Sequence, residues 1–560
     1  MKTGRHTSFI MRRLTSACIA AAISLFMSPP AHAARGEDFD PNHPERMTVT
    51  PDVTVRNYVA EGSGGVPYVS VIFTGGETVW VSPLFDELMA EDFPDTYRQL
   101  WMKGRLSEDR SKLTIPGGTL AGEGQIGILR RPHERFYICP MVYRGGDDSF
   151  NTWAVDDSAG DIVMSISPEG DMSLLGADDT HGVGVVTQYG VVVSTSWIEG
   201  NDIVYGPYVI NGLRMRPADL QTVMPPPGLP VEDYQFLYTE PTEDPDRWDY
   251  RETVGRWVRS VTDGDDIYFQ GLSYGDPGGW IAGKIGGGKV TFPAGEFSSL
   301  NTQTRYFYSP GRMNRLFAAR EDKGYDGFKP VCDYIPLEGD LVFEYESVSG
   351  ALTPSGEDAV MMFTDGPDHP VRYRYDRTEE GWLPYVGHDD VFKCPVLKRV
   401  PPGPQIPRQP VVDYENRKIR GSYYDIDKNV MRADSLFFRV YVNGERLMFY
   451  QDMLYNYWFE EPVAEVPVSM LYTYKERSDK DAYCCLSFRE NFPDGAEVTA
   501  ELVYYQDGAE HSSSGVGSVT DDSTPGDAVA PVYDLAGRKV SPDNLRPGIY
   551  IRGNKKIIVR

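Results

Sequence analysis

The sequence predicts an all-β protein made of tandem antiparallel β-domains, and three observations support this fold class. First, 56 glycines and 42 prolines accompany 35 tyrosines and 24 phenylalanines, a composition that suits pleated strands joined by tight turns. Second, long apolar stripes at helical spacing are scarce. Third, a block of short strand-like motifs occurs twice along the chain, which indicates a duplicated structural unit.

The duplicated block lies at residues 77–118 and 265–295. Its motifs are ETVWVSPL, WMKGRL and KLTIPGG in the first copy, and DDIYFQGL, WIAGKI and KVTFPAG in the second. The matched positions are Trp101 with Trp280, Gly104 with Gly283, Pro116 with Pro293, Asp161 with Asp340, Gly170 with Gly350 and Leu174 with Leu352. Because repetition of a large aromatic usually reports packing, we expect both tryptophans in sheet cores; exposed sugar-stacking platforms are the alternative.

Two proline-rich stretches, MPPPGLP at residues 224–230 and VPPGPQIP at residues 400–407, mark the ends of the copies. We therefore expect one β-domain over residues 40–224 and its repeat over residues 230–400, with the proline stretches as semi-rigid spacers. The alternative is a single propeller-like assembly of residues 40–400, since short strands with repeated Trp and Gly also fit propeller blades.

Residues 405–508 form a third predicted domain. Leu436–Val442, the pair Asn443-Gly444 and residues 445–450 have the pattern of a β-hairpin with a type I′ turn. Further strands are expected at 463–474, 482–488 and 497–505. About 100 residues with strands at this spacing predict a fibronectin- or immunoglobulin-like β-sandwich. The small, polar residues 509–530 predict a flexible linker.

The N-terminus has the pattern of a secretory signal peptide. Lys2, Arg5, Arg12 and Arg13 precede an apolar run at residues 16–27, and Ala31-His32-Ala33 supplies the small residues that signal peptidase needs. We expect cleavage after Ala33 and no transmembrane span after removal of the signal; an uncleaved membrane anchor is the alternative.

The last thirty residues, 531–560, predict three short strands with turns at Gly537, Gly548 and Gly553. The sequence Val532-Tyr-Asp-x-x-Gly-Arg, then Gly548-Ile-Tyr-Ile and a basic-aliphatic end, resembles the terminal part of the type IX (Por) secretion C-terminal sorting domain. Across most of its length the chain also resembles modular secreted bacterial proteins of uncharacterised function. The resemblance implies that the secretion machinery is a partner and that the protein is secreted or lies on the outer cell surface. Since only the end of the sorting domain is matched, the periplasm is the alternative location.

The net charge and the cysteine content indicate which classes of ligand and of cross-link or metal site are disfavoured. The chain carries a formal net charge of −27, which disfavours nucleic acid and anionic lipid as ligands. Five cysteines remain after signal removal, an odd number without zinc spacing, so neither a disulfide framework nor a zinc site is expected. They are Cys139, Cys332, Cys394, Cys484 and Cys485.

No motif assigns a catalytic, cofactor or metal residue. Residues 122–127 match GxGxxG, but the expected strand and helix do not flank them, and a loop fits better. HExxH is absent from the sequence. Asp425-Ile-Asp427-Lys-Asn429 begins like a calcium loop and then departs from it, so a polar turn is expected, with a looser calcium site as the alternative. The six histidines after residue 33, His181 among them, are expected in solvated loops. Adjacent acid pairs are expected on the loop surface: Asp147-Asp148, Asp156-Asp157, Asp178-Asp179 and Asp389-Asp390.

The sequence therefore favours an exported, noncatalytic binding protein that recognises glycans or surface proteins. The candidate ligand patch is Tyr455, Tyr457 and Trp458, within the aromatic run YNYWF, with burial in a core as the alternative. Two other functions remain open. One is a secreted hydrolase acting on polysaccharide or peptide, because many exported enzymes carry such tails. The other is a structural scaffold whose edge strands pair with partners.

Overall fold

The computed structural model describes residues 39–63, 65–85, 98–126, 131–145, 153–176, 180–188, 190, 192, 194–199, 202–207, 209–239, 253–301, 311–356, 359–378, 381–385, 390–450, 453–455, 461–470, 473–474, 483–492, 495–506, 508–513, 532–534, 539–540, 548–552 and 555–559. These residues form antiparallel strands and contain no α-helix; the 3₁₀ turns are η2 (Pro44–Arg46), η5 (Ala433–Ser435) and η6 (Val468–Met470). The predicted all-β fold class is confirmed. The described residues divide into two compact units, before and after residue 401.

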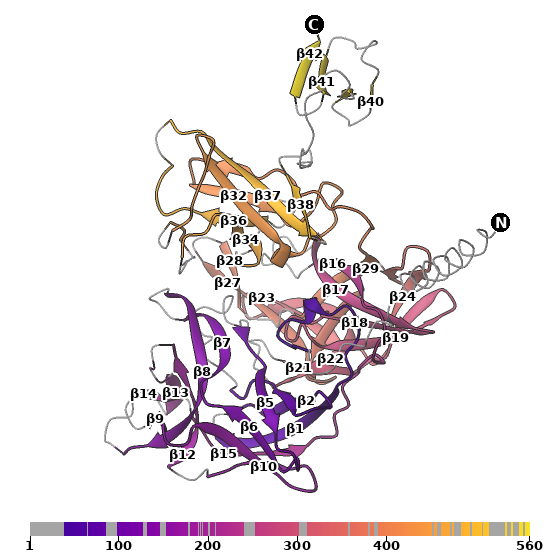
Figure 1. Ribbon diagram of the computed structural model, residues 1–560. Coiled ribbons are helices and arrows are strands. Elements are labelled where there is room, and N and C mark those ends of the chain that lie inside the picture. Colours follow the sequence, from indigo (N-terminus) through magenta and orange to yellow (C-terminus); the bar gives the residue numbers. More distant parts are fainter. Residues whose placement is uncertain are drawn as a thin grey trace, which may run out of the picture. The chain divides into compact units, whose positions relative to one another are not determined.

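The first copy of the duplicated unit is a closed ring of antiparallel strands (Figure 1, indigo to purple). In spatial order the ring contains β1 (Thr54–Ser63), β2 (Tyr68–Phe73), β3 (Thr78–Val81), β5 (Met102–Leu106), β6 (Lys112–Pro116), β10 (Asp161–Ile166), β11 (Met172–Leu174) and β15 (Val209–Pro217). Pairing of β1 with β15, for example Ala60 opposite Met215, closes the ring.

A second layer of strands extends from the first half of β15. It runs through β12 (His181–Thr187), β8 (Arg131–Tyr143), β7 (Thr119–Ile126) and β4 (Arg98–Gln99), with β9 (Trp153–Val155) also paired to β8. β13 (Ser194–Glu199) and β14 (Asp202–Pro207) form a separate hairpin. The GxGxxG sequence therefore does not lie in the predicted loop: Gly122 pairs with Phe136 inside β7, and no helix follows among the described residues.

The second copy repeats this order (Figure 1, magenta to salmon). Its ring contains β16 (Glu232–Thr239), β17 (Thr253–Asp263), β18 (Asp266–Gln270), β19 (Trp280–Gly286), β20 (Lys289–Phe292), β24 (Leu341–Glu346), β25 (Ala351–Pro354) and β29 (Val391–Arg399), and β16 pairs with β29. Its second layer contains β26 (Val360–Thr364), β22 (Met313–Asp326), β21 (Glu296–Leu300), β23 (Lys329–Pro336), β27 (Val371–Thr378) and β28 (Gly381–Tyr385). Because each copy closes its own ring, the alternative of one propeller-like assembly is wrong.

Strand pairing gives the exact correspondence of the copies. Gly104 pairs with Val79, and Gly283 pairs with Ile267, in the register that the sequence motifs predict. One predicted match is wrong: Leu352 pairs with Tyr345 as Met172 pairs with Ile166, so Met172 and not Leu174 is its counterpart. The turn before Leu352 contains one residue more than the turn before Met172, so the two copies do not align here without a gap.

The two rings are filled differently. Val81, Ile115 and Met164 are buried in the first ring, whereas the second holds Phe269, Phe292 and Phe343 at the corresponding points, in edge-to-face or tilted contacts with one another. Trp280 is 2 % exposed, which confirms the predicted core position, but Trp101 is only half-buried. The duplication therefore preserves strand order while the core side chains have diverged.

The first proline-rich stretch is held against the chain rather than acting as an open spacer. Buried Thr50 donates its hydroxyl to the carbonyl of Pro226 at 2.5 Å, and the N–H of Leu229 donates to that hydroxyl at 2.9 Å. The backbone N–H of Thr50 in turn donates to the carbonyl of Leu229. These bonds tie the segment before the first copy to the start of the second.

The second unit contains two antiparallel sheets (Figure 1, orange). One has the order β30 (Val411–Asp413), β31 (Lys418–Ser422), β36 (Tyr483–Ser487) and β35 (Thr473–Tyr474). The other has the order β33 (Glu445–Arg446), β32 (Leu436–Val442), β37 (Val498–Gln506) and β38 (Ala509–Ser512), with β34 (Val466–Pro467) on β32. A Cβ on Gly421 would lie 2.6 Å from Phe438 and 2.9 Å from Leu502, so the sheets pack face to face there. Asn443 and Gly444 both have positive φ, as the predicted I′ turn requires.

The C-terminal residues form a small sheet of their own, in the order β40 (Lys539–Val540), β39 (Val532–Asp534), β41 (Gly548–Arg552) and β42 (Lys555–Val559). Four strands appear where three were predicted. Gly548 begins β41 and pairs with Val559, so the predicted turn at this glycine is wrong. Gly537 and Gly553 lie outside the described residues.

Candidate functional site

A cavity of about 340 Å³ lies in the first copy, between the strand ring and the second layer. Its described lining comes from β8, the turn after β9, β10, the end of β11 and the start of β12. The apolar lining residues include Met141, Ile162 and Val183, which are buried in the core, and Leu174, which is partly buried. Three ionisable side chains, Asp156, Asp161 and His181, face it. A cavity that combines an apolar wall with a few polar groups is the usual form of a small-ligand site.

Asp156 is positioned by the turn that follows β9. Its backbone N–H donates to the carbonyl of Pro140 at 2.9 Å. Its Oδ1 accepts the N–H and the hydroxyl of Ser158 at 3.0 and 2.5 Å. The hydroxyl of Ser158, together with its N–H and the nearby His181, holds the pKa of the Asp156 carboxyl below its usual value. Asp156 therefore presents an ionised carboxylate to the cavity at neutral pH.

The same turn in the second copy carries a different residue. The N–H of Leu337 donates to the carbonyl of Ala318 at 2.8 Å, as Asp156 does to Pro140, and Pro140 and Ala318 occupy equivalent register positions opposite Val183 and Met361. Leu337 is thus the counterpart of Asp156. A carboxylate at this point is a property of the first copy and is not required by the fold.

Asp161 makes a structural hydrogen bond that also occurs in the second copy. Its Oδ1 accepts the N–H of Gly117 at 3.4 Å, and in the second copy Asp340 accepts the N–H of Ala294 at 3.2 Å. The repeated Asp therefore holds the corner after the Pro of the preceding strand. In the first copy this carboxylate also borders the cavity.

His181 begins β12, opposite Val142 of β8. Its Nδ1 lies 2.9 Å from the hydroxyl of Thr180. The ring is half-buried and borders the cavity, so the predicted solvated loop position is wrong for this histidine. Its counterpart in the second copy is Ala359, since Met361 matches Val183. Both Asp156 and His181 are therefore polar replacements specific to the first copy.

Gly182 allows the second layer to approach this wall. A Cβ at residue 182 would lie 2.4 Å from Oδ1 of Asn211 and 2.7 Å from the carbonyl oxygen of Ile210. The corresponding residue of the second copy is Val360, which is buried. The first copy thus differs from the second in backbone spacing as well as in charge at this point.

The predicted aromatic patch is placed only in part. Tyr455 is 41 % exposed, and the guanidinium carbon of Arg417 lies 5.8 Å from its ring centroid. Its N–H donates to the carbonyl of Ser487 at 2.9 Å. Tyr457 and Trp458 lie outside the described residues, as does the predicted cleavage site at Ala33.

The loop considered for calcium is closed by its own donors. Asp425 is 2 % exposed, and its Oδ1 accepts the N–H groups of Asp427 and Asn429 at 2.9 and 2.7 Å. Its Oδ2 accepts the side-chain amide of Asn429 at 3.1 Å. Among the described residues, no group of three or more His, Cys, Asp or Glu side chains is arranged to hold a metal. The contacts of Asp425 are those of the polar turn that the sequence predicts.

Asp390, predicted on a surface loop, is instead fully buried. It accepts the hydroxyl of Ser273 at 2.6 Å and the N–H of Tyr274 at 2.7 Å. The guanidinium of Arg256 lies 3.9 Å from the ring centroid of Tyr274 and 5.2 Å from that of Phe392. This polar cluster anchors residues 271–279 in the second copy.

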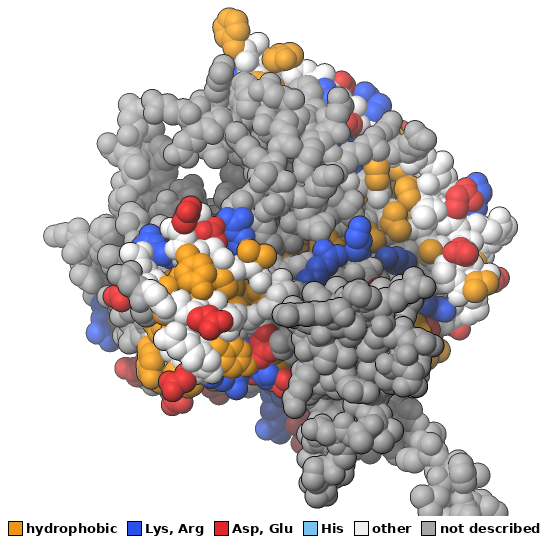
Figure 2. All heavy atoms as spheres, turned by 90° about the horizontal axis from the view of Figure 1, so that it is seen from above, with side chains coloured by type: hydrophobic (Ala, Val, Ile, Leu, Met, Phe, Trp, Pro, Cys, Tyr) orange, Lys and Arg blue, Asp and Glu red, His pale blue; other side chains and the backbone are white. Residues whose placement is uncertain are grey.

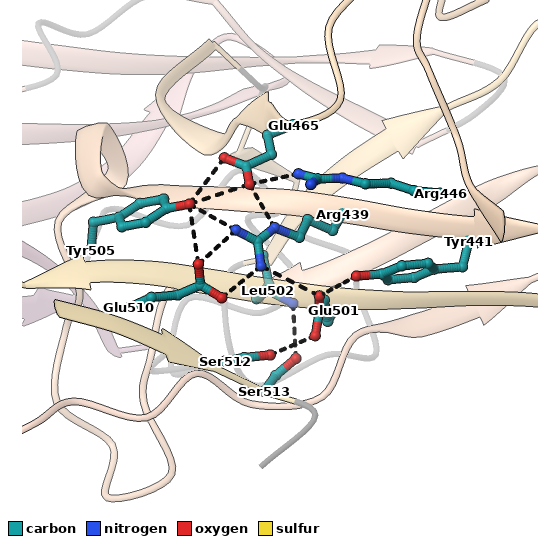
Figure 3. Close-up of polar contacts among 10 residues, drawn as sticks. All are labelled: Arg439, Tyr441, Arg446, Glu465, Glu501, Leu502, Tyr505, Glu510, Ser512 and Ser513. Carbon is teal, nitrogen blue, oxygen red and sulfur yellow. Dashed lines mark hydrogen bonds and ion pairs between the residues drawn. The ribbon is translucent and has the colours of Figure 1, made fainter. Parts of the chain in front are cut away.

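A third polar cluster lies on the second unit, centred on Arg439 (Figure 3). Arg439 bonds Glu465 and both oxygens of Glu510 at 2.6–2.8 Å, and it lies 3.7 Å from Glu501. Glu501 also accepts the hydroxyls of Tyr441 and Ser512, each at 2.6 Å. Only 12 % of the Arg439 side chain is exposed. The cluster joins β32, β37, β38 and the segment before β34, and it is a stabilising element of the fold.

The surface in Figure 2 shows small apolar patches interspersed with acidic and basic side chains on the described part of this face. Among the described residues, no helix is long and apolar enough to cross a membrane. Searches against protein-family models, curated proteins and solved structures find no match to this chain.

Proposed function

We propose that this protein is an exported, noncatalytic binding protein for glycans, and that the cavity of the first copy holds one sugar unit. The observation that carries the proposal is the presence of Asp156 and His181 together with apolar residues in the lining of a cavity of about 340 Å³. Sugars present hydroxyl donors on their edges and C–H groups on their faces. Carboxylates accept the former, and apolar side chains pack against the latter.

The lowered pKa of Asp156 disfavours this residue as the proton donor of a glycosidase. A glycosidase needs a carboxylic acid whose pKa is raised so that it can protonate the leaving oxygen. The hydrogen bonds from Ser158 lower the pKa of Asp156 instead.

Export is supported by the sequence at both ends. The basic and apolar leader of residues 1–33 has signal-peptide character, and residues 531–560 resemble the end of a type IX sorting domain. A protein exported by these two signals encounters polysaccharides and surface proteins outside the cytoplasm. Recognition of a glycan at the cell surface or in the medium is therefore consistent with the charge and the architecture.

A glycan-array screen of the purified mature chain, with and without calcium, tests the proposal. The matched control is the double variant Asp156→Leu with His181→Ala, which gives the first copy the residues that the second carries at these positions. We expect saturable binding by the natural protein and its loss in the variant. A folded natural protein that binds no glycan, or equal binding by both proteins, would contradict the proposal; turnover of a polysaccharide would favour the hydrolase instead.

A further inference from the structure

We propose that the glycan unit held in this cavity carries a protonated amine, so that the ligand is an amino sugar. This inference rests on the proposed function and narrows its ligand class. It follows from the charges that face the cavity and from the acceptor oxygens that the fold leaves unused there. Each of these observations concerns the first copy only.

The described cavity lining contains two carboxylates and one imidazole, and it contains no Lys or Arg. An anionic sugar, such as a uronic or sialic acid, would be repelled by Asp156 and Asp161, and no Lys or Arg of the described lining would offset the repulsion. A neutral sugar would offer these carboxylates only neutral hydroxyl donors. A cationic ligand gains charge-assisted hydrogen bonds instead, which are roughly twice as strong as neutral ones.

One oxygen of each carboxylate is available to such a ligand. Ser158 donates both of its hydrogen bonds to Oδ1 of Asp156, and Gly117 donates to Oδ1 of Asp161. Among the described residues, no donor bonds to Oδ2 of either side chain. An ammonium group has three N–H donors, enough to engage both of these oxygens.

An organic amine fits this cavity better than a metal ion does. Val163 and Leu174 are partly buried apolar residues of the lining, and such side chains pack against the carbon skeleton of a sugar. The described residues offer no group of three side chains that could coordinate a metal. The volume of about 340 Å³ is at the lower end of the range for small-molecule sites, in keeping with a single ring.

Calorimetric titration of the full mature chain at pH 7 tests this inference with methyl glycosides of glucosamine, N-acetylglucosamine and glucose. These three probes differ only in the substituent at carbon 2. We expect the glucosaminide to bind at least about tenfold more tightly than the other two, the gain of one charge-assisted hydrogen bond. Added salt should weaken the glucosaminide alone.

The variants Asp156→Asn and Asp161→Asn should each reduce glucosaminide affinity about tenfold or more while far-UV circular dichroism remains unchanged. Asp340→Asn is the matched control, because it removes the same corner hydrogen bond as Asp161→Asn but in the second copy. It should leave binding unchanged.

Three results would overturn the inference, and they separate it from the proposed function. If the three glycosides bind equally, the amine inference is wrong while glycan binding stands. If none binds and the array is also blank, both fail. If calcium chloride saturates the site and displaces the glucosaminide, the cavity is a metal site and the amine inference is wrong.

Discussion

Gly283 of β19 lies so close to Val290 of β20 that a Cβ at residue 283 would sit 2.7 Å from Cγ1 of Val290. Gly104 stands in the same relation to Leu113 in the first copy, at 2.9 Å. The glycine of the repeated Trp-x-x-Gly motif is therefore required by the approach of the next strand. Neither glycine has a positive φ, so the constraint is steric crowding and not backbone strain.

Replacing Gly283 by Ala should destabilise the second ring by about 1–3 kcal/mol, the usual cost of overpacking a core. Gly286→Ala is the matched control on the same strand, since a Cβ there would meet nothing within 4 Å. Denaturant unfolding of both variants measures the difference. Equal stability of the two variants would show that the crowding at Gly283 is relieved without cost.

Removal of the Arg439 guanidinium should destabilise the second unit strongly. Arg439→Met leaves Glu465, Glu501 and Glu510 clustered with only Arg446 as a cation, and breaking a largely buried ion pair costs about 3–5 kcal/mol. Hydrogen exchange of the β37 amides reports this locally. Arg372→Met, at an arginine whose side chain is 57 % exposed and paired with Asp333, is the control and should change stability by less than about 1 kcal/mol. Unchanged hydrogen exchange of the β37 amides in Arg439→Met would contradict a stabilising role for the Arg439 cluster.

Glu296 should make the second copy less stable as the pH rises from about 4.5 to about 7. Burial raises the pKa of its carboxyl to about 7, although the N–H of Ala282, 3.0 Å from Oε2, acts in the opposite sense. Because the folded state binds the proton more tightly than the unfolded state, stability falls as the pH rises from about 4.5 to about 7, by at most about 3 kcal/mol.

Glu296→Gln should abolish this decline and raise stability at pH 8 relative to the natural protein. Thermal unfolding of both proteins between pH 5 and pH 8 measures the difference. Parallel stability curves for the two proteins over this range would be incompatible with a buried, proton-binding Glu296.

Deletion of residues 531–560 should change the cellular compartment in which the protein accumulates. If this segment is the sorting signal that it resembles, a host with the matching secretion system should retain the truncated chain in the periplasm and export the full chain. Immunoblots of medium, surface and periplasmic fractions measure this. Export of the truncated chain at the normal level would remove the support for a C-terminal sorting signal.

Local rules explain which features could be predicted from the sequence. The turn at Asn443-Gly444 follows from the positive φ that these residues tolerate, and the match of Gly104 with Gly283 follows from a short motif that includes the crowding strand residues Leu113 and Val290. The ring closure between β1 and β15 could not be predicted, because it joins strands about 150 residues apart.

The candidate site was not predictable for a similar reason. Asp156 and His181 are 25 residues apart in the sequence and border one cavity only because β8 pairs with both β9 and β12. An acid pair such as Asp156-Asp157 indicates a loop, and nothing local shows that one member faces a cavity. Asp390 was assigned to the surface because its donors, Ser273 and Tyr274, lie more than 110 residues away. A comparison of the two copies at each register position would have exposed Asp156 and His181 as unmatched polar residues.

The most direct test of the account is the affinity of the natural protein for its best array glycan, compared with two variants that exchange the copies' side chains. Asp156→Leu with His181→Ala converts the cavity to the residues of the second copy, while Leu337→Ala alters the equivalent turn of the second copy as a control. We predict that calorimetry finds at least about a tenfold loss of affinity in the first variant and none in the second. Unchanged affinity in the first variant, with the protein folded, would contradict the claim that this cavity binds the glycan.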